Sequence, residues 1–132
     1  MSNIKVFYFP IYGRAEPIRM LLSHAKQDYE DVRYTFEEWG KIKGESRFEF
    51  GQLPAVEWDG ETYTQSASIL RALGQKFGYY STDAVTMWRI DSTIDALSDL
   101  VAAIYKAVFN KHAEEQAKQF EELFSTTIPK FY

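Results

Sequence analysis

The stretch QLPAVEWDGETYTQS, residues 52–66, contains a β-hairpin followed by the start of a helix. Its runs AVEW and ETYT are strand-like, and Asp59-Gly60 between them favours a type I′ turn, which needs positive φ at both central positions. Two features do not belong to a plain hairpin. Pro54 removes a hydrogen-bond donor just before the first strand, and Gln65-Ser66 stands at the start of a helical pattern. The fold must explain both.

Strand-like and helix-like segments alternate along residues 4–77. Runs of β-branched and aromatic residues mark the strands, and apolar residues three and four apart mark the helices. In order, they are strand Ile4–Phe9, helix Glu16–His24, strand Tyr29–Thr35, a broken helix in Glu37–Phe50, strands Ala55–Trp58 and Glu61–Thr64, and helix Ser66–Phe77. The βαβ unit makes its strands parallel and the hairpin adds antiparallel ones, so the sheet is mixed. The order βαβ-α-ββα with a proline before the third strand is that of an α/β thioredoxin-like domain.

Residues 83–124 have a different character, with no proline, no glycine and no strand pattern. Apolar spacings of four and three predict a helix over 83–109 that packs along its whole length, and a more charged helix over 113–124. The stripe of the first helix consists of Ile90, Ile94, Leu97, Val101, Ile104 and Val108. Two helices cannot bury both flanks of this stripe. We therefore expect the helical part to pack against the first domain, against a partner, or against both.

The closing residues STTIPKFY resemble the start of a third helix, because two threonines with Pro129 are typical of a helix N-terminus. The chain ends three residues later. We therefore expect two domains, one over residues 1–80 and a partial all-α domain over 83–132.

The composition argues against several classes of function. Fifteen Lys and Arg against 19 Asp and Glu give a net charge of −4, which does not indicate a nucleic-acid partner. There is no cysteine, and His24 and His112 are isolated, so no disulfide, thiolate nucleophile or zinc cluster is expected. The longest apolar run, Leu100–Tyr105, is too short to span a bilayer, and MSNIKVFYF does not resemble a signal peptide. We expect a cytoplasmic protein with no membrane partner.

A thioredoxin-like fold gives the two unusual features of the hairpin a role. In that fold the proline is cis, which leaves the preceding backbone, here that of Leu53, open to pair with an extended peptide. Ser66 begins the next helix as its expected N-cap, and free N–H groups at a helix start attract a carboxylate. Together these features describe a slot for a short acidic peptide. Thioredoxins use a Cys-x-x-Cys motif, so in this chain any thiol must come with the ligand.

Four motifs closely resemble cytosolic glutathione transferases, nearest the sigma-like and mu-like groups. They are YFPIYGRAEPIR (8–19), GQLPAVEWDG (51–60), QSASILRALGQKFG (65–78) and RIDSTIDALSDL (89–100). The resemblance implies a glutathione-binding thioredoxin-like domain, then an all-helical domain, usually in a homodimer. Family members continue for several more helices than this chain contains.

The resemblance gives Tyr8 the role of catalytic residue. A phenol at a strand end can donate a hydrogen bond to a bound sulfur and favour thiolate over thiol. Lowering a thiol pKa by two units takes about 2.7 kcal/mol, within reach of one charge-assisted bond plus a helix N-terminus. Alternatively, Tyr8 is a core aromatic, since alternation does not separate it from Phe7 and Phe9. Arg14 lines the site, or pairs with Glu16 or a later acid.

The same resemblance implies residues for each part of glutathione. Gln65 and Ser66 match the pair that grips the γ-glutamyl carboxylate, and Leu53 exchanges backbone bonds with the cysteinyl unit. Trp39 and Lys43 resemble residues that hold the glycyl carboxylate, with a surface anchor and a solvated charge as alternatives. The full expected set is Arg14, Trp39, Lys43, Gln52, Leu53, Pro54, Gln65, Ser66 and Asp99.

Asp91, Asp95 and Asp99 are four apart and share one helix face. In the family, the acid that matches Asp99 reaches across the dimer to the γ-glutamyl amine of the neighbour's ligand. The alternative is a solvated acidic face. Some relatives bind a divalent metal here through a further acid, but this chain has Ser98, so no metal is expected.

Two classes of function are compatible with these residues. The first is an enzyme that activates glutathione, its co-substrate, as thiolate for conjugation to small electrophiles, with no other cofactor. Some relatives instead isomerise prostaglandin-type endoperoxides. The second is a structural or assembly module, like the lens crystallins derived from this family. Tyr8, Leu53-Pro54 and Gln65-Ser66 favour the enzyme, whereas the short helical domain favours the module. We predict a glutathione transferase.

Overall fold

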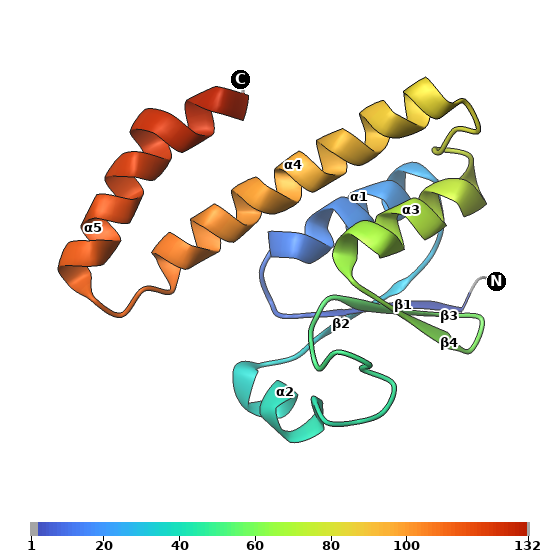
Figure 1. The fold of residues 1–132 in the computed structure, drawn as a ribbon. Coiled ribbons are helices and arrows are strands. Elements are labelled where there is room, and N and C mark those ends of the chain that lie inside the picture. The colour runs from blue at the N-terminus through green and yellow to red at the C-terminus, as the bar shows by residue number, and fades with distance from the viewer. Residues whose placement is uncertain (1–2, 132) are drawn as a thin grey trace. The chain divides into compact units, whose positions relative to one another are not determined.

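The structure is a computed structural model that describes residues 3–131. The chain forms two compact units, one ending at Met87 and the other beginning at Trp88. The first unit contains a four-stranded sheet with helices on both faces, and the second is helical (Figure 1). The expected thioredoxin-like sheet followed by a helical region is confirmed.

The strands of the first unit form one mixed sheet in the order β2-β1-β3-β4. β1 (Ile4–Tyr8) pairs in parallel with β2 (Glu30–Arg33) and antiparallel with β3 (Ala55–Trp58), and β3 pairs antiparallel with β4 (Glu61–Thr64). The Asp59-Gly60 turn has φ values of 50° and 86°, both positive as a type I′ turn requires. The predicted hairpin is therefore confirmed, with its predicted bounds.

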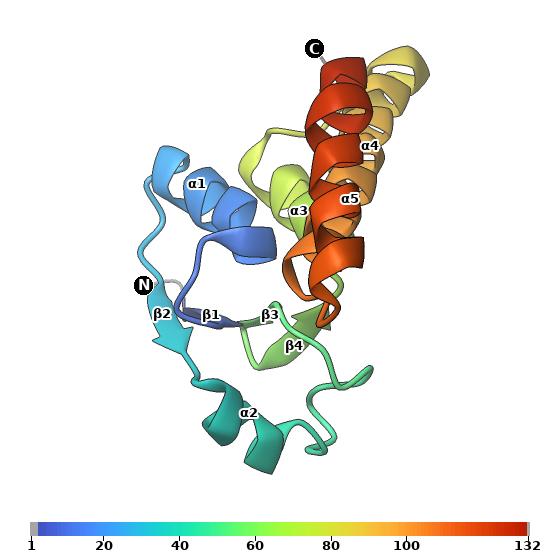
Figure 2. The same cartoon turned by 90° about the vertical axis from the view of Figure 1, so that its left-hand side faces the viewer.

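Two helices cover one face of the sheet and a third lies on the other (Figure 2). α1 (Glu16–His24) and α3 (Ser66–Phe77) enclose a core with β1 and β3, and α2 (Phe36–Ile42) contributes to a second cluster. The first cluster consists of Ile4, Val6, Tyr8, Ala15, Ile18, Leu22, Val56, Ile69 and Leu73. The second consists of Phe7, Trp39, Phe48 and Ala55. Side chains of β1 thus alternate between the two clusters, as a strand buried on both faces requires.

Two strands are shorter than predicted because neighbouring turns take their last residues. β1 ends at Tyr8 and not at Phe9, and β2 ends at Arg33 because Thr35 is the N-cap of α2. The Glu38 N–H donates to the Thr35 hydroxyl at 3.2 Å, and the Thr35 N–H donates to the Glu38 carboxylate at 2.7 Å. This capping box starts a helix where the apolar pattern alone extends a strand.

The second unit contains most of α4 (Ala84–Val108), followed by α5 (Ala113–Glu122), which turns back (Figure 1). The Gln116 side-chain amide donates to the Ala107 carbonyl at 3.0 Å and closes this turn. The chain then passes without a break through a π-helical turn, Leu123–Thr127, and a 3₁₀ turn, Ile128–Phe131. Pro129 is the second residue of this 3₁₀ turn, and the start of a third helix at the end of the chain stays a prediction.

The apolar stripe of α4 is not buried along its whole length. Leu97 is 50% exposed and Val108 is 45% exposed. In the described part of the second unit, α5 is the only other α-helix, and a single neighbour covers only one side of a helix. Packing of the whole stripe against the first domain or a partner therefore stays a prediction.

Candidate functional site

Three segments of the first unit lie together at one edge of the sheet, namely the edge at which β1 and β4 end and β3 begins. A single row of paired residues crosses β1, β3 and β4 at Phe7, Ala55 and Thr64. The next residues beyond this row are Tyr8, Pro54 and Gln65, so the strand register places them at the same edge. β2 contributes as well, because the Tyr34 N–H donates to the Tyr8 carbonyl at 2.8 Å just before α2 begins. The register therefore brings three of the predicted site residues, Tyr8, Pro54 and Gln65, to this edge.

Tyr8 is both a core residue and a hydrogen-bonded phenol. It is only 3% exposed and shares the first cluster with Ile4 and Val6, whereas Phe7 lies in the second. Its hydroxyl accepts the backbone N–H of Arg14 at 3.2 Å. A hydroxyl that accepts in this way still has its own proton to donate. The packing and the polar contact are thus compatible, and the catalytic role stays a prediction.

Arg14 lies in a short 3₁₀ turn, Gly13–Ala15, between β1 and α1. It reaches the Tyr8 hydroxyl through its backbone N–H. The Glu16 carboxylate, one of the suggested partners of Arg14, is 3.1 Å from Arg19 Nη1. The structure thus places the main chain of Arg14 at the candidate site.

The loop before β3 is tied to the start of α3. The Gln65 side-chain amide donates to the Gln52 side-chain oxygen at 3.1 Å. Gln65 has a φ of 68°, which is uncommon for a residue other than glycine and points to a constrained position. The Leu53-Pro54 peptide bond is cis, as predicted.

Ser66 is the first residue of α3, and Gln65 is the N-cap without a side-chain capping bond. The prediction that Ser66 is the N-cap is therefore wrong. The reason is the backbone of Gln65, whose positive φ turns the chain from β4 into α3, so that Ser66 already has helical geometry. Ser66 still lies in the first turn, where helix N–H groups lack intrahelical partners.

Trp39 and Lys43 lie one turn apart at the end of α2. Trp39 is 8% exposed and packs edge-on against Phe48, with ring centroids 4.9 Å apart. The alternative interpretation as a surface anchor is therefore wrong. Lys43 is exposed, and its N–H donates to the Trp39 carbonyl at 2.9 Å. The two residues lie one helical turn apart, and Lys43 is exposed whereas Trp39 is buried.

The acidic residues of the fourth motif lie on α4 in the second unit. Asp95 and Asp99 are exposed and Asp91 is half-buried. Their spacing of four along a continuous helix places all three on one face, as expected. Within residues 3–131, no group of three or more His, Cys, Asp or Glu side chains has an arrangement that fits a metal ion. No described helix has the length and apolar character to cross a membrane.

Two features near the site were missed from the sequence although their signals were present. Arg19 is 5% exposed on α1, at a helical position that shares the buried face of Ala15, Ile18 and Leu22. A charged residue at a core position of the periodic pattern indicates a buried ionic network. The second feature is the capping box of α2, whose signature is Thr35 followed three residues later by Glu38.

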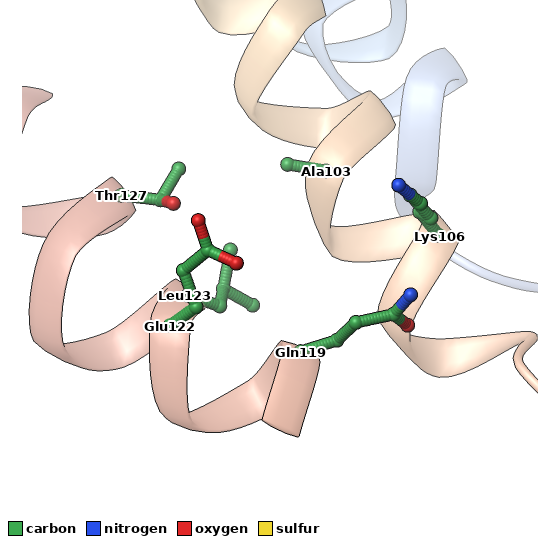
Figure 3. A pocket seen from close by; sticks show the side chains of 6 residues that line it. All are labelled: Ala103, Lys106, Gln119, Glu122, Leu123 and Thr127. Carbon is green, nitrogen blue, oxygen red and sulfur yellow. The ribbon is translucent and has the colours of Figure 1, made fainter. Parts of the chain in front are cut away.

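A hollow in the second unit is a weaker candidate. Side chains of α4 and of the segment from α5 onward line it (Figure 3). Its volume is about 180 Å³, whereas ligand pockets usually measure about 300–1,000 Å³. The lining residues are Ala103, Lys106, Gln119, Glu122, Leu123 and Thr127. The sheet edge of the first unit therefore remains the candidate site.

Comparison with known proteins identifies the family. The family model for the glutathione S-transferase N-terminal domain matches residues 3–74. Glutathione S-transferase 2 of Manduca sexta is 33% identical over 129 residues, which cover 98% of this chain and 62% of that protein. The chain belongs to the glutathione S-transferase family.

Two solved structures extend the comparison. Prostaglandin synthase D of Nilaparvata lugens is 34% identical with a TM-score of 0.88, over 98% of this chain and 64% of that one. A Nu-class glutathione S-transferase from Haemonchus contortus is 44% identical with a TM-score of 0.69, over 78% of this chain and 50% of that one. The matches are thus not confined to the sigma-like and mu-like groups. The chain spans between 50% and 64% of the length of these three relatives.

Proposed function

We propose that the first unit binds glutathione at the sheet edge and favours its thiolate form, so that the sulfur attacks small electrophiles. The observation that carries this proposal is the convergence of Tyr8, Pro54 and Gln65 at one edge through the strand register. The Arg14 N–H donates to the Tyr8 hydroxyl at 3.2 Å and holds the phenol oxygen at this edge. Membership of the glutathione S-transferase family supports the same activity.

The γ-glutamyl end of glutathione binds at the start of α3 in this proposal. Gln65 and Ser66 supply polar groups there, and the first N–H groups of this 12-residue helix attract the carboxylate. The bond from Gln65 to Gln52 holds the two loops of the site together. The Leu53 backbone pairs with the cysteinyl unit.

The glycyl end lies toward α2. Lys43 is an exposed cation at the end of that helix, and its ammonium pairs with the glycyl carboxylate. Trp39 holds the helix in place from the second cluster, and its indole edge contributes to the same subsite. Glutathione bound in this way places its sulfur between the two ends, beside the hydroxyl of Tyr8.

The chemistry needs only a shift of the thiol toward thiolate. A free thiol has a pKa of about 8.5, so little of it is ionised at neutral pH. Hydrogen bonds to the charged form stabilise it, and each unit of pKa corresponds to about 1.4 kcal/mol. The Tyr8 hydroxyl is the donor that we assign to the sulfur. Glutathione is the co-substrate, and no metal takes part.

We propose the wider organisation on the same grounds. Residues 1–80 form the glutathione-binding domain and 83–132 belong to the helical domain, within a cytoplasmic homodimer. Asp99 of each chain reaches the γ-glutamyl amine of its neighbour's ligand. The motifs at 8–19 and 51–60 support a sigma-like or mu-like class. A second candidate, a glutathione-dependent isomerase, has the support of the likeness to prostaglandin synthase D.

The test is binding and ionisation of glutathione by this chain. We expect glutathione and S-methylglutathione to bind with similar affinity, because the slot holds the peptide, and the bound thiol to ionise well below its free pKa of about 8.5. Calorimetry gives the affinities, and thiolate absorbance against pH gives the pKa. A chain that binds neither ligand, or that leaves the thiol pKa unchanged, contradicts the proposal.

A further inference from the structure

We propose that Arg19 is a positioning residue for Tyr8. It fixes the loop between β1 and α1 so that the Arg14 N–H meets the Tyr8 hydroxyl and holds the phenol oxygen in place. The inference rests on the proposed function, in which the Tyr8 hydroxyl donates a hydrogen bond to the glutathione sulfur.

The first observation is the position of the guanidinium. Arg19 is 5% exposed, and its Nη1 donates to the carbonyl of Ile11 at 3.1 Å and to that of Tyr12 at 3.4 Å. These two carbonyls belong to the loop that immediately precedes the turn containing Arg14. The Tyr12 carbonyl also accepts the Glu16 N–H at 3.0 Å, where α1 begins. The loop is thus held by one side chain from inside the fold.

The second observation is how the guanidinium is itself anchored. Its Nε donates to the Asp31 carboxylate on β2 at 3.1 Å, and Nη1 is 3.1 Å from the Glu16 carboxylate on α1. Three elements therefore fix its position: a strand, its own helix and the loop. From Arg19 the bonds run through the loop carbonyls to the turn, and from the Arg14 N–H to the Tyr8 hydroxyl.

The third observation is electrostatic. The central carbon of the Arg19 guanidinium is 5.9 Å from the centre of the Tyr8 ring, within the range of a cation–π contact. A positive charge beside a phenol draws electron density from it and makes its hydroxyl a stronger hydrogen-bond donor. The same group therefore orients Tyr8 and strengthens the bond that we assign to it.

Packing alone does not explain a charged residue here. Among the described residues, Nη2 of Arg19 is buried without a hydrogen-bond partner. An unpaired buried donor is unfavourable, and buried ion pairs often contribute less stability than apolar side chains of similar volume. A buried arginine with one unpaired nitrogen, next to the candidate catalytic residue, is in keeping with a functional role.

Two substitutions separate the parts of this role. Arg19→Met keeps the length of the side chain and removes its charge and donors. Arg19→Lys restores the charge, but a single ammonium cannot reach both loop carbonyls and Asp31. Arg33→Met is the matched control, because Arg33 pairs with the other oxygen of Asp31 at 2.8 Å but is 44% exposed and makes no bond to the loop among those described.

The readout is the pKa of the thiol of bound glutathione, from thiolate absorbance, together with the affinity for S-methylglutathione. We expect Arg19→Met to raise the thiol pKa by roughly one unit, a tenfold fall in the ionisation constant of the bound thiol, with less than about a twofold change in affinity. Arg19→Lys raises it by less, and Arg33→Met leaves it unchanged. If Arg19→Met does not fold, a raised thiol pKa in Arg19→Lys supports the inference.

The inference and the proposed function fail in different ways. If wild-type protein does not lower the thiol pKa at all, the proposed function is wrong. If wild-type protein lowers it and the folded Arg19 variants lower it equally, Arg19 is only structural and this inference is overturned. A rise in Arg33→Met as large as that in the Arg19 variants also overturns it, because the effect then belongs to Asp31 in general.

Discussion

The two units of this chain bury their side chains to different degrees. In the first unit, Tyr8 is packed in the first buried cluster, and its strand β1 is hydrogen-bonded to a neighbouring strand on each side. In the second unit, two successive helices are joined by a turn, and several large apolar side chains stay exposed. These are Trp88, Leu97, Val108, Phe109, Phe124 and Phe131. A role for Tyr8 can therefore be argued from its own unit, whereas the role proposed for Asp99 requires a partner.

This difference in burial predicts that equivalent truncations in the two units change the free energy of unfolding by different amounts. Ile69 is 1% exposed and packs in the cluster that contains Tyr8, whereas Leu97 is 50% exposed on α4. Ile69→Ala should lower the free energy of unfolding by about 2–5 kcal/mol, because it leaves a cavity in a closed core. Leu97→Ala should change it by less than about 0.5 kcal/mol. Urea unfolding followed by circular dichroism measures both.

An equal loss of unfolding free energy in the two variants contradicts this prediction. It means that Leu97 is covered in solution, as expected if α4 takes part in the proposed homodimer. Repeating the unfolding of Leu97→Ala over a range of protein concentrations distinguishes a partner from a contact within one chain, because only the first depends on concentration.

A second prediction concerns the acid of the second unit. Asp99→Ala should weaken glutathione binding by about 1–3 kcal/mol, the cost of a lost charge-assisted contact, if its carboxylate meets the γ-glutamyl amine of the neighbour's ligand. Asp95→Ala, one turn earlier on the same exposed face, is the matched control and should have little effect. Calorimetric titration with glutathione measures the difference.

Mixed dimers decide whether Asp99 acts across the interface. In a dimer of one Asp99→Ala chain and one Tyr8→Phe chain, a contact between subunits places both defects in one site and leaves the other site intact. If Asp99 instead acts within its own subunit, one site carries the Asp99→Ala defect and the other carries the Tyr8→Phe defect. Thiolate absorbance that retains about half of the wild-type signal supports the cross-subunit role.

Much of the first unit could be predicted from the sequence because its signals are local. The Asp59-Gly60 turn sets the bounds of β3 and β4, and apolar periodicity sets those of α1 and α3, all as observed. The end of β2 was misjudged because a β-branched residue, Thr35, fits a strand as well as a helix cap.

The parts that could not be predicted depend on contacts between distant residues. The alternation within VFYF does not determine toward which face of the sheet Tyr8 points, because β1 is buried on both sides and every residue of the run suits a core. The partners of Arg19 come from β2 and from a loop, so its position on the buried face of α1 indicates a network without naming its members. The burial of Trp39 likewise depends on Phe48, which lies beyond the end of α2.

A third prediction tests the central residue of the first unit. Tyr8→Phe removes the hydroxyl and keeps the ring, so the first cluster stays packed. Glutathione affinity should stay nearly the same, the pKa of the bound thiol should rise, and conjugation should slow tenfold or more, a loss of about 1.4 kcal/mol. Thiolate absorbance against pH and the conjugation rate with an aryl halide are the measurements. Tyr63→Phe, in which a partly buried tyrosine of β4 loses its hydroxyl, is the control.

The smallest expected effect is a pH dependence of α2. Hydrogen bonds from the Thr35 backbone and side chain lower the pKa of the Glu38 carboxyl below its ordinary value. A carboxyl whose pKa is lower in the folded state stabilises the fold above its unfolded pKa, and this contribution is lost as the pH falls through the folded value. The amides of α2 should therefore exchange faster, relative to those of α3, as the pH falls from about 5 toward 3.

Glu38→Gln should remove most of this pH dependence, because the amide does not titrate. Glu37→Gln is the control, since Glu37 lies in the same first turn but pairs with Lys41 at 2.9 Å, outside the capping box. Because Trp39 and Lys43 are carried by α2, loosening this helix should also weaken the binding of glutathione more than that of a γ-glutamyl-cysteine dipeptide, which lacks the glycyl carboxylate. Equal weakening of the two ligands at low pH indicates that α2 does not hold the glycyl end.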